Sequence, residues 1–234
     1  MSLINLAGLT KEVGNLAQEV AVFIRNEAGK VRQQDIQTKA RNNFVSYVDT
    51  QSEQQIVSGL KQLLPDAGFI AEENTVALSQ HDYQWIIDPL DGTTNFLRNI
   101  PSYAISIALM YKNTIVLGVV YEINRNECFT AYKNGGAFLN NEAIHVSQVN
   151  TMDASFFATG FPYYDYTIFD NYNKVLQEIM RRTTGIRRLG AAAVDLCYVA
   201  CGRFDGFWEH SLQAWDVAAG SIIVQEAGGM VSDF

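Results

Sequence analysis

The sequence has no apolar run long enough to cross a membrane. Its longest apolar stretches, 104–110 and 115–121, have the length of a β-strand, whereas a membrane-spanning helix needs about 20 consecutive apolar residues. Charged residues make up only 18% of the chain, and hydrophobic residues make up 48%. A chain with this composition can bury a core, so both an integral membrane protein and wholesale disorder are excluded.

Cysteine and positive charge are both scarce. Cys128, Cys197 and Cys201 are odd in number and lie in apolar surroundings, which predicts buried thiols in a reducing compartment. The N-terminus shows no secretory signal pattern, so we expect a cytoplasmic protein. The net charge of −8 argues against nucleic acid and anionic membranes as partners. The visible basic cluster consists of Arg181, Arg182, Arg187 and Arg188.

Several familiar catalytic motifs are missing. The sequence contains no G-x-S-x-G, no P-loop and no G-x-G-x-x-G, which argues against a nucleophile elbow and the common nucleotide-binding loops. Its three histidines lack the paired spacing of zinc ligands. Cys197 and Cys201 share one face of an apolar helical pattern and are predicted to be core thiols. The carboxylates are therefore the strongest candidates for functional side chains.

The chain of 234 residues predicts an α/β protein with two closely packed halves. Residues 1–150 form an α+β half: a helix over about 3–28, a second helix that begins at a Thr50/Glu53 capping box and ends before Pro65, and then mostly strands. In residues 151–234 strands alternate with helices, which is typical of an α/β half. A further strand is expected to begin after Gly228.

The individual elements follow from hydrophobic periodicity and turn signals. Strands are predicted at 44–48, 69–71, 83–87, 102–111, 115–123, 128–132, 154–159 and 203–209, a hairpin at 135–141, and helices at 168–181, 191–200 and 217–227.

The most informative motif follows the predicted strand 83–87. Asp88 and Asp91 lie three residues apart, and Pro89 stiffens the turn between them, so both carboxylates can converge on one hard divalent cation. Gly92 and Thr93 come next, at an expected helix N-terminus whose N–H groups would suit a phosphate oxygen. An ordinary turn is the alternative explanation, because Asp and Pro are common turn residues.

Further carboxylates stand at the predicted ends of strands or starts of helices. They are Asp49, Glu72, Glu209 and Asp216. Each alone has a structural explanation, such as a helix cap or a solvated loop. Together they lie where α/β proteins place their sites, and like charges gathered there repel unless a cation neutralises them. The set predicts a site that binds divalent metal ions.

These motifs resemble those of the inositol monophosphatases, within the wider lithium-sensitive, magnesium-dependent phosphomonoesterase superfamily. The first signature corresponds to residues 85–96 and the second to 215–220, continued at 226–229. Shorter pieces at 45–49, 71–73 and 190–192 fall in the family's order. The resemblance covers essentially the whole chain. It implies a layered α/β/α/β/α sandwich, a homodimer, and about two or three Mg²⁺ ions per site, as in multi-metal phosphatases.

The resemblance also implies roles for individual residues. The implied metal ligands are Glu72, Asp88, the Leu90 carbonyl, Asp91 and Asp216. The implied catalytic residues are Glu72, Thr93 and Asp49, with Thr93 positioning the attacking water and Asp49 holding Thr93. The implied substrate contacts are Asp91, Gly92, Thr93, Gly190, Ala191, Ala192 and Glu209, the last four facing the alcohol. Lys39 lies near a lysine position of the family but in an unfixed register, so it has no role here. The family's closing strand and helix are expected to be missing after Phe234.

The expected activity is therefore Mg²⁺-dependent hydrolysis of a phosphate monoester, with myo-inositol monophosphate as the leading substrate. Metal ions reverse the local sign of charge, which lets an acidic protein bind an anionic small molecule. Other monoesters stay open as alternatives: 3′-phosphoadenosine 5′-phosphate, fructose 1,6-bisphosphate and histidinol phosphate. A non-catalytic regulatory binding protein on the same fold is the remaining alternative, because a fold does not by itself establish activity.

Overall fold

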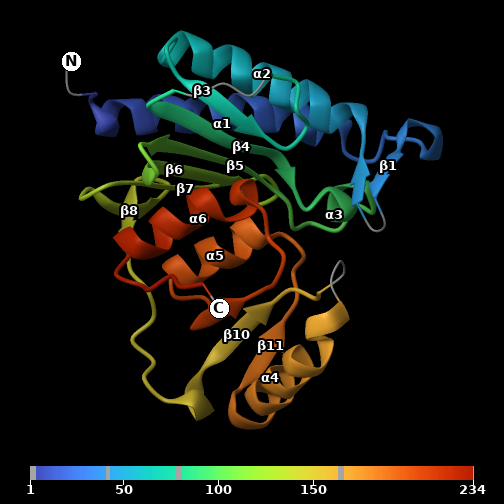
Figure 1. The fold of residues 1–234 in the computed structure, drawn as a ribbon, viewed down its shortest axis with the longest axis vertical. Coiled ribbons are helices and arrows are strands. Elements are labelled where there is room, and N and C mark those ends of the chain that lie inside the picture. Colours follow the sequence, from blue (N-terminus) through green and yellow to red (C-terminus); the bar gives the residue numbers. More distant parts are fainter. Residues whose placement is uncertain (1–3, 41–42, 77–80, 163–165, 234) are drawn as a thin grey trace.

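The computed structural model describes residues 4–40, 43–76, 81–162 and 166–233. Its layers follow one another in the order helix, sheet, helix, sheet, helix (Figure 1). The first layer holds α1 (Leu6–Glu27) and α2 (Tyr47–Leu63), the middle layer α5 (Ala192–Ala200) and α6 (Ala214–Glu226), and the last layer α4 (Phe169–Arg182). The predicted α/β class and its layered α/β/α/β/α sandwich are confirmed.

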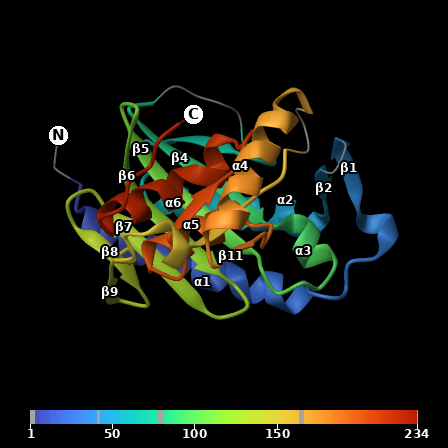
Figure 2. The ribbon, with the colours of Figure 1, turned by 90° about the horizontal axis from the view of Figure 1, so that it is seen from below.

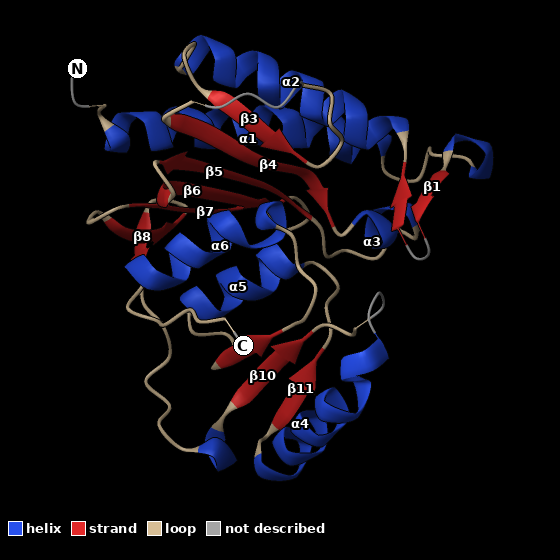
Figure 3. Ribbon diagram, in the orientation of Figure 1, coloured by secondary structure: helices blue, strands red, loops and turns tan. Residues whose placement is uncertain are grey.

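The larger sheet has seven strands in sequence order and separates the first two helical layers (Figure 3). Its strands are β3 (Gly68–Ala71), β4 (Tyr83–Asp91), β5 (Ala104–Tyr111), β6 (Thr114–Glu122), β7 (Glu127–Tyr132), β8 (Gly136–Leu139) and β9 (Glu142–Ile144). Strand β3 pairs with β4 in parallel, and all later neighbours are antiparallel. The sheet therefore brings the ends of β3 and β4, which carry the predicted metal ligands, to the same edge.

Alternation along β4 explains why the central strands are apolar throughout. Trp85 and Ile87 belong to the core beneath α1 and α2, whereas Ile86 belongs to the core on the opposite face, with α5 and α6. All three side chains are buried. A strand covered by helices on both faces has no solvated side, so its sequence reads as a continuous hydrophobic run.

The smaller sheet is parallel and has the order β11-β10-β12. Its strands are β10 (Phe156–Thr159), β11 (Gly185–Arg187) and β12 (Gly206–Trp208). Helix α4 covers β11, and Figure 2 shows this helix from below. The residues that follow β11 and β12 line the same cavity as those that follow β4, so the carboxyl ends of these three strands meet at one place. The predicted division of the chain near residue 150 stays a prediction.

Helix α2 begins earlier than predicted. Its N-cap is Ser46, whose hydroxyl accepts from the Val48 N–H and whose own N–H donates to Asp49 at 2.9 Å, so the capping box is Ser46/Asp49 and the predicted Thr50/Glu53 box is wrong. Glu53 has tertiary partners instead. Its buried carboxylate accepts from the Glu73 N–H at 2.7 Å and the Thr75 N–H at 2.8 Å.

Short extended pieces also differ from the predictions. The piece predicted at 44–48 is only the short strand β2 (Asn43–Val45), which pairs with β1 (Gln37–Ala40). The strand expected after Gly228 is wrong for the described residues, since 229–233 join no sheet. Strand β4 is longer than expected and runs through both aspartates to Asp91. Among the described residues, no helix has the length and apolar character needed to cross a bilayer.

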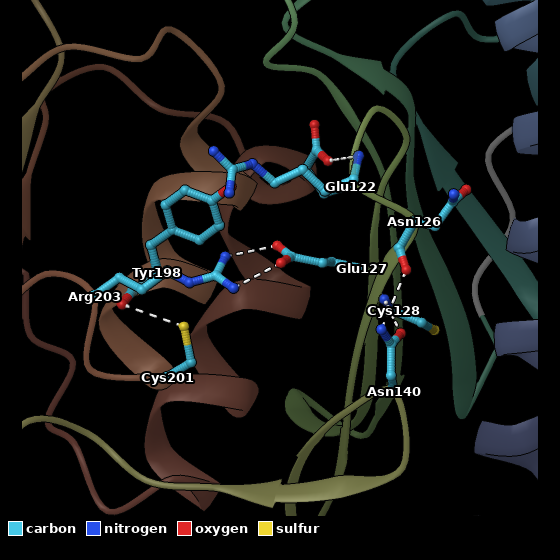
Figure 4. A network of polar contacts seen from close by, with 9 residues as sticks. Glu122, Asn126, Glu127, Cys128, Asn140, Tyr198, Cys201 and Arg203 are labelled. Atoms are coloured by element: carbon cyan, nitrogen blue, oxygen red, sulfur yellow. Dashed lines mark hydrogen bonds and ion pairs between the residues drawn. The ribbon is translucent and has the colours of Figure 1, made fainter.

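A polar network connects the larger sheet to the turn after α5 (Figure 4). Arg203 forms two hydrogen bonds of 2.6 Å to the Glu127 carboxylate on β7. Its guanidinium also lies 4.6 Å from the ring centre of Tyr198. This bidentate and stacked geometry is specific to arginine and fixes the middle helical layer to the sheet. Nearby, the Cys201 thiol faces the Tyr198 carbonyl.

The cysteines partly match the prediction of buried thiols. Cys197 is fully buried, whereas Cys128 and Cys201 are half-buried, and all three are free thiols. Burial raises the pKa of Cys197 well above its usual value. A buried thiol with a raised pKa is a poor nucleophile, because less of it is present as thiolate.

Candidate active site

One cavity of about 640 Å³ lies where the two sheets and the middle helices meet. The sequence-predicted residues that line it are Glu72, Asp91, Gly92, Thr93, Gly190, Ala192, Glu209 and Asp216. These residues come from the ends of β3, β4, β11 and β12 and from the first turns of α3 (Thr93–Leu97), α5 and α6. Segments that are distant in sequence thus contribute to one concave site, the usual location of a small-molecule site.

The other predicted residues lie behind this surface. The side chains of Asp49, Asp88, Leu90 and Ala191 are each at most 2% exposed. Ala191 is the N-cap of α5. Lys39 is part of β1, and its side chain lies outside the described part of the chain.

A β-bulge aims the two aspartates of β4. Asp88 pairs with Ser106 and Asp91 with Ala104, so three steps along β4 oppose two steps along β5. Pro89 sits in the bulge, where the N–H that proline lacks is not needed by a regular ladder. The bulge explains how two side chains with odd spacing on one strand can serve the same site.

Four carboxylates interact electrostatically across the cavity. Burial raises the pKa of Asp88 well above its usual value, and Glu72, Asp91 and Asp216 raise it further. Burial likewise raises the pKa of Asp91, and Asp216 is the largest charge acting on it. The pKa of Asp216 rises to about 6, mainly through burial, with Glu72 adding to the effect. So much negative charge in one buried place favours a cation.

The oxygen donors at the cavity suit an open Mg²⁺ site, in which water and substrate complete the coordination, better than a site closed by protein ligands alone. Within the part of the chain that the structure describes, no three His, Cys, Asp or Glu side chains already form a metal-binding group. Mg²⁺ commonly binds through one or two carboxylates and keeps water and substrate phosphate oxygens as its other ligands. Glu72, Asp91 and Asp216 all line the cavity and present oxygen atoms of this kind.

The half-buried Thr93 and the buried Asp49 form a polar pair beside these carboxylates. The Thr93 hydroxyl lies 3.0 Å from Oδ1 of Asp49 and 2.9 Å from the Leu90 carbonyl oxygen. Oδ2 of Asp49 accepts from both the N–H and the hydroxyl of Ser46. Burial raises the pKa of Asp49, and the hydrogen bonds from Ser46 and Thr93 oppose that rise. Asp49 is therefore both a helix-capping residue and a fixed acceptor for Thr93.

Backbone donors hold the two aspartates of β4 in place. The Leu90 N–H donates to Oδ1 of Asp88 at 2.9 Å, and the Ala193 N–H, in the first turn of α5, donates to Oδ2 of Asp91 at 2.8 Å. These bonds orient each carboxylate without supplying a positive charge. The α5 backbone thus connects the second half of the chain to a predicted ligand in the first.

Gly92 links the bulge to α3 with a conformation that favours glycine. Its φ is +86°, and a Cβ built there would lie 2.9 Å from the Ser102 carbonyl oxygen. A side chain at this position would therefore be strained and would collide with backbone. The assignment of phosphate contacts to Gly92 and Thr93 stays a prediction.

Sequence reasoning missed three residues in or near the cavity. Arg188 lines the cavity, although the sequence showed it only as a member of a basic cluster. Asp195 is fully buried on α5, and neither of its carboxylate oxygens has a hydrogen-bond partner. Gly160 lies against Glu209, because a Cβ there would overlap the Glu209 carboxylate. The available signal was a lone acid in the apolar stretch 191–201, which helix periodicity alone leaves unexplained.

Comparison with known proteins agrees with this architecture. The chain is 45% identical over 218 residues to a putative Nus factor SuhB from Neisseria meningitidis. The alignment covers 93% of this chain and 84% of that protein. It is 40% identical over 218 residues to an inositol-1-monophosphatase from Mesorhizobium japonicum. That alignment covers 93% of this chain and 82% of the relative.

Solved structures of related proteins share the fold of this chain. The crystal structure of the extragenic suppressor protein suhB from Bartonella henselae superposes with a TM-score of 0.91 at 39% identity, covering 97% of this chain and 87% of that one. The profile of the inositol monophosphatase family matches residues 6–234. By sequence, fold and the extent of both matches, the chain belongs to the inositol monophosphatase family.

Proposed function

We propose that this protein is a Mg²⁺-dependent phosphate monoester hydrolase that acts on myo-inositol monophosphate. Family membership supports the hydrolase class, and one relative is named an inositol-1-monophosphatase. The observation that carries the proposal is a group of four interacting carboxylates: Glu72, Asp91 and Asp216 line one cavity, and Asp88 lies buried behind it.

The phosphate end of the site uses these carboxylates and the Thr93–Asp49 pair. The chemistry that Mg²⁺ supplies in such sites is neutralisation of the phosphoryl oxygens and acidification of water. Glu72, Asp88, Asp91, Asp216 and the Leu90 carbonyl would hold the metal. The Thr93 hydroxyl can donate its single proton to Asp49, which leaves its lone pairs to accept from a water molecule. Asp49 thereby fixes the direction in which Thr93 orients that water.

The other end of the cavity would bind the alcohol. Glu209 follows β12, and burial raises its pKa to about 7, while Arg188 acts in the opposite direction. A carboxylate there can accept hydrogen bonds from polyol hydroxyls. Gly190 and Ala192 also line this cavity and leave room for a ring. We assign these residues and the neighbouring Ala191 to the alcohol, and Asp91, Gly92 and Thr93 to the phosphate.

A second candidate function comes from the names of the relatives. The N. meningitidis protein is named a putative Nus factor, and other relatives are named Nus factors. This naming favours a role as a Nus factor alongside hydrolysis or in its place. The two functions separate in an Asp216→Asn variant, because removing a metal-binding carboxylate should stop hydrolysis. Complementation of a strain that lacks its own SuhB by this variant would favour a Nus-factor role that needs no catalysis.

The decisive experiment measures phosphate release from a panel of monoesters at fixed Mg²⁺. The panel contains myo-inositol 1-phosphate, 3′-phosphoadenosine 5′-phosphate, fructose 1,6-bisphosphate and histidinol phosphate. EDTA should abolish release and added Mg²⁺ should restore it, and myo-inositol 1-phosphate should be the best substrate. Full activity of metal-free protein would overturn the metal-dependent mechanism, and no activity on any substrate would overturn the hydrolase. The homodimer stays a prediction that analytical ultracentrifugation can test.

A further inference from the structure

The alcohol end of the cavity contains a positive side chain that hydrolysis itself does not require. Arg188 follows β11 and lines the same cavity as Glu209. Its guanidinium carbon lies 5.7 Å from the ring centre of Phe161, which also lines the cavity. A Cβ built on Gly190 would press against Nη1 of Arg188, so the guanidinium packs on bare backbone. These contacts restrict a side chain that is otherwise flexible.

Glu209 is placed in the same way. A Cβ built on Gly160 would overlap the Glu209 carboxylate, so this carboxylate also packs on a glycine. Arg188 is the largest charge acting on Glu209, and it lowers the pKa that burial raises. A planar group with several donors and a group with only acceptors thus lie within electrostatic range at one end of the cavity.

Asp195 places a second carboxyl group within electrostatic range of Arg188. Its side chain is fully buried on α5, and neither oxygen has a hydrogen-bond partner. Burial raises the pKa of Asp195 well above its usual value, Glu209 raises it further and Arg188 lowers it, so all three groups interact. The Glu209 carboxyl, which lines the cavity beside the guanidinium, disfavours a second anionic group on the substrate. The guanidinium in turn disfavours an ammonium group.

An uncharged polyol is repelled neither by the carboxyl groups nor by the guanidinium. Each hydroxyl can donate one hydrogen bond and accept others, so neighbouring hydroxyls can satisfy a carboxylate and a guanidinium together. Specificity of this kind depends on repulsion of competitors as well as attraction of the substrate. The alternative substrates differ in this respect, because fructose 1,6-bisphosphate carries a second phosphate and histidinol phosphate carries an ammonium.

We propose that Arg188 is a specificity-determining residue that donates to one hydroxyl of an uncharged polyol while Glu209 accepts from another. The inference rests on the proposed function and deepens it, because it names a further residue that selects the alcohol. Arg188 does not act at the phosphate. Its loss should therefore affect a polyol substrate and spare a substrate without hydroxyls.

The test compares Arg188→Met with the matched control Arg188→Lys, which keeps a charged donor. Each variant is assayed with Mg²⁺ on myo-inositol 1-phosphate and on p-nitrophenyl phosphate. Arg188→Met should lower kcat/KM for inositol phosphate by about 10- to 100-fold, the range for one hydrogen bond to a charged group. It should change kcat/KM for p-nitrophenyl phosphate by less than about twofold, and Arg188→Lys should fall between Arg188→Met and wild type on the polyol.

The outcomes separate this inference from the function on which it rests. A wild-type protein that releases no phosphate from either substrate overturns both. Equal losses on both substrates in Arg188→Met, or no loss on either, overturn the inference and leave the hydrolase intact. A wild-type preference for fructose 1,6-bisphosphate or histidinol phosphate over inositol phosphate also overturns it. Melting temperatures of the two variants within a few degrees of wild type show that the differences arise in the site.

Discussion

The Thr93 hydroxyl lies 3.0 Å from Oδ1 of Asp49, although 44 residues separate them in the sequence. The other Asp49 oxygen is held by Ser46, the N-cap of α2. A helix-capping interaction thus also fixes the orientation of a hydroxyl in the cavity. The same carboxylate caps a helix and, in the proposed mechanism, holds the hydroxyl that orients water.

Removing the Thr93 hydroxyl should reduce turnover with little effect on folding. Thr93→Ala leaves Asp49 with its two bonds from Ser46 but deprives the water of its acceptor. We expect kcat to fall by about 100-fold or more, as for loss of a group that orients a reacting proton. Thr93→Ser is the matched control and should keep most of the activity. Phosphate release at saturating Mg²⁺ measures both, and a Thr93→Ala enzyme within twofold of wild type would contradict the role.

Two substitutions of Asp91 should separate its charge from its hydrogen bond. Asp91→Asn removes one of several repelling charges and keeps an oxygen that can accept from the Ala193 N–H. Its metal-free melting temperature should therefore hold or rise, while turnover is nearly lost. Asp91→Ala also removes the acceptor and should cost about 1–3 kcal/mol, because a buried N–H is left unpaired. Calorimetry in EDTA checks both, and a large destabilisation by Asp91→Asn would favour a purely structural turn.

The sequence was enough to predict features that rest on local patterns. The apolar spacing of α1 and the run of apolar residues in β4 are of this kind, as are the two aspartates of the bulge. The capping box of α2 could not be placed because Thr50 and Glu53 have the right spacing, and only the fold shows that Glu53 binds the backbone of residues 73 and 75. The local sequence is compatible with two capping boxes, Ser46/Asp49 and Thr50/Glu53, and the tertiary contacts of Glu53 exclude the second.

Sequence reasoning missed Arg188 and Asp195 for the same reason: the position of each depends on how the elements pack. Arg188 resembles its neighbour Arg187 in sequence, and only the fold shows that Arg188 lines the cavity. Asp195 lies in the first turn of α5, where an acid is ordinary, and its lack of partners is visible only once α5 is packed. Hydrophobic periodicity reports local secondary structure, so it does not show which residues tertiary packing brings to a cavity.

The carboxylates should make the metal-free protein less stable as the pH rises. Burial raises the pKa of Glu209 from its usual 4.5 to about 7 and that of Asp216 from 3.8 to about 6. A raised pKa means that the folded state binds the proton more tightly than the unfolded chain. The stabilisation is full below the usual pKa values and is lost as the pH rises through about 6 to 7.

Melting temperatures in EDTA between about pH 4.5 and pH 8 test this sign. The melting temperature should fall across the interval, and Glu209→Gln should make the fall shallower because glutamine does not titrate. With saturating Mg²⁺ the trend should weaken or reverse, since metal binding requires deprotonated carboxylates. A metal-free protein that gains stability across the interval would show that these carboxylates are not buried together.

Gly160 and Glu209 give a prediction in which two different substitutions should have the same effect. A Cβ at residue 160 would overlap the Glu209 carboxylate, which is the far end of a flexible side chain and can move aside. Gly160→Ala should therefore displace Glu209 without unfolding the protein. Both Gly160→Ala and Glu209→Gln should lower kcat/KM for inositol phosphate by about 10- to 100-fold, through loss of a hydrogen bond to a charged acceptor. Both should largely spare p-nitrophenyl phosphate, which has no polyol hydroxyls.

The double variant is the sharper measurement. If Gly160 acts only by leaving space for Glu209, the losses should not add, and Gly160→Ala combined with Glu209→Gln should resemble the worse single variant. Independent roles would instead multiply the two effects on kcat/KM. Equal losses on both substrates in Glu209→Gln would place Glu209 with the metal-binding carboxylates. The comparison thus decides whether the end of β12 selects the alcohol, because only a selecting residue changes one substrate and leaves the other alone.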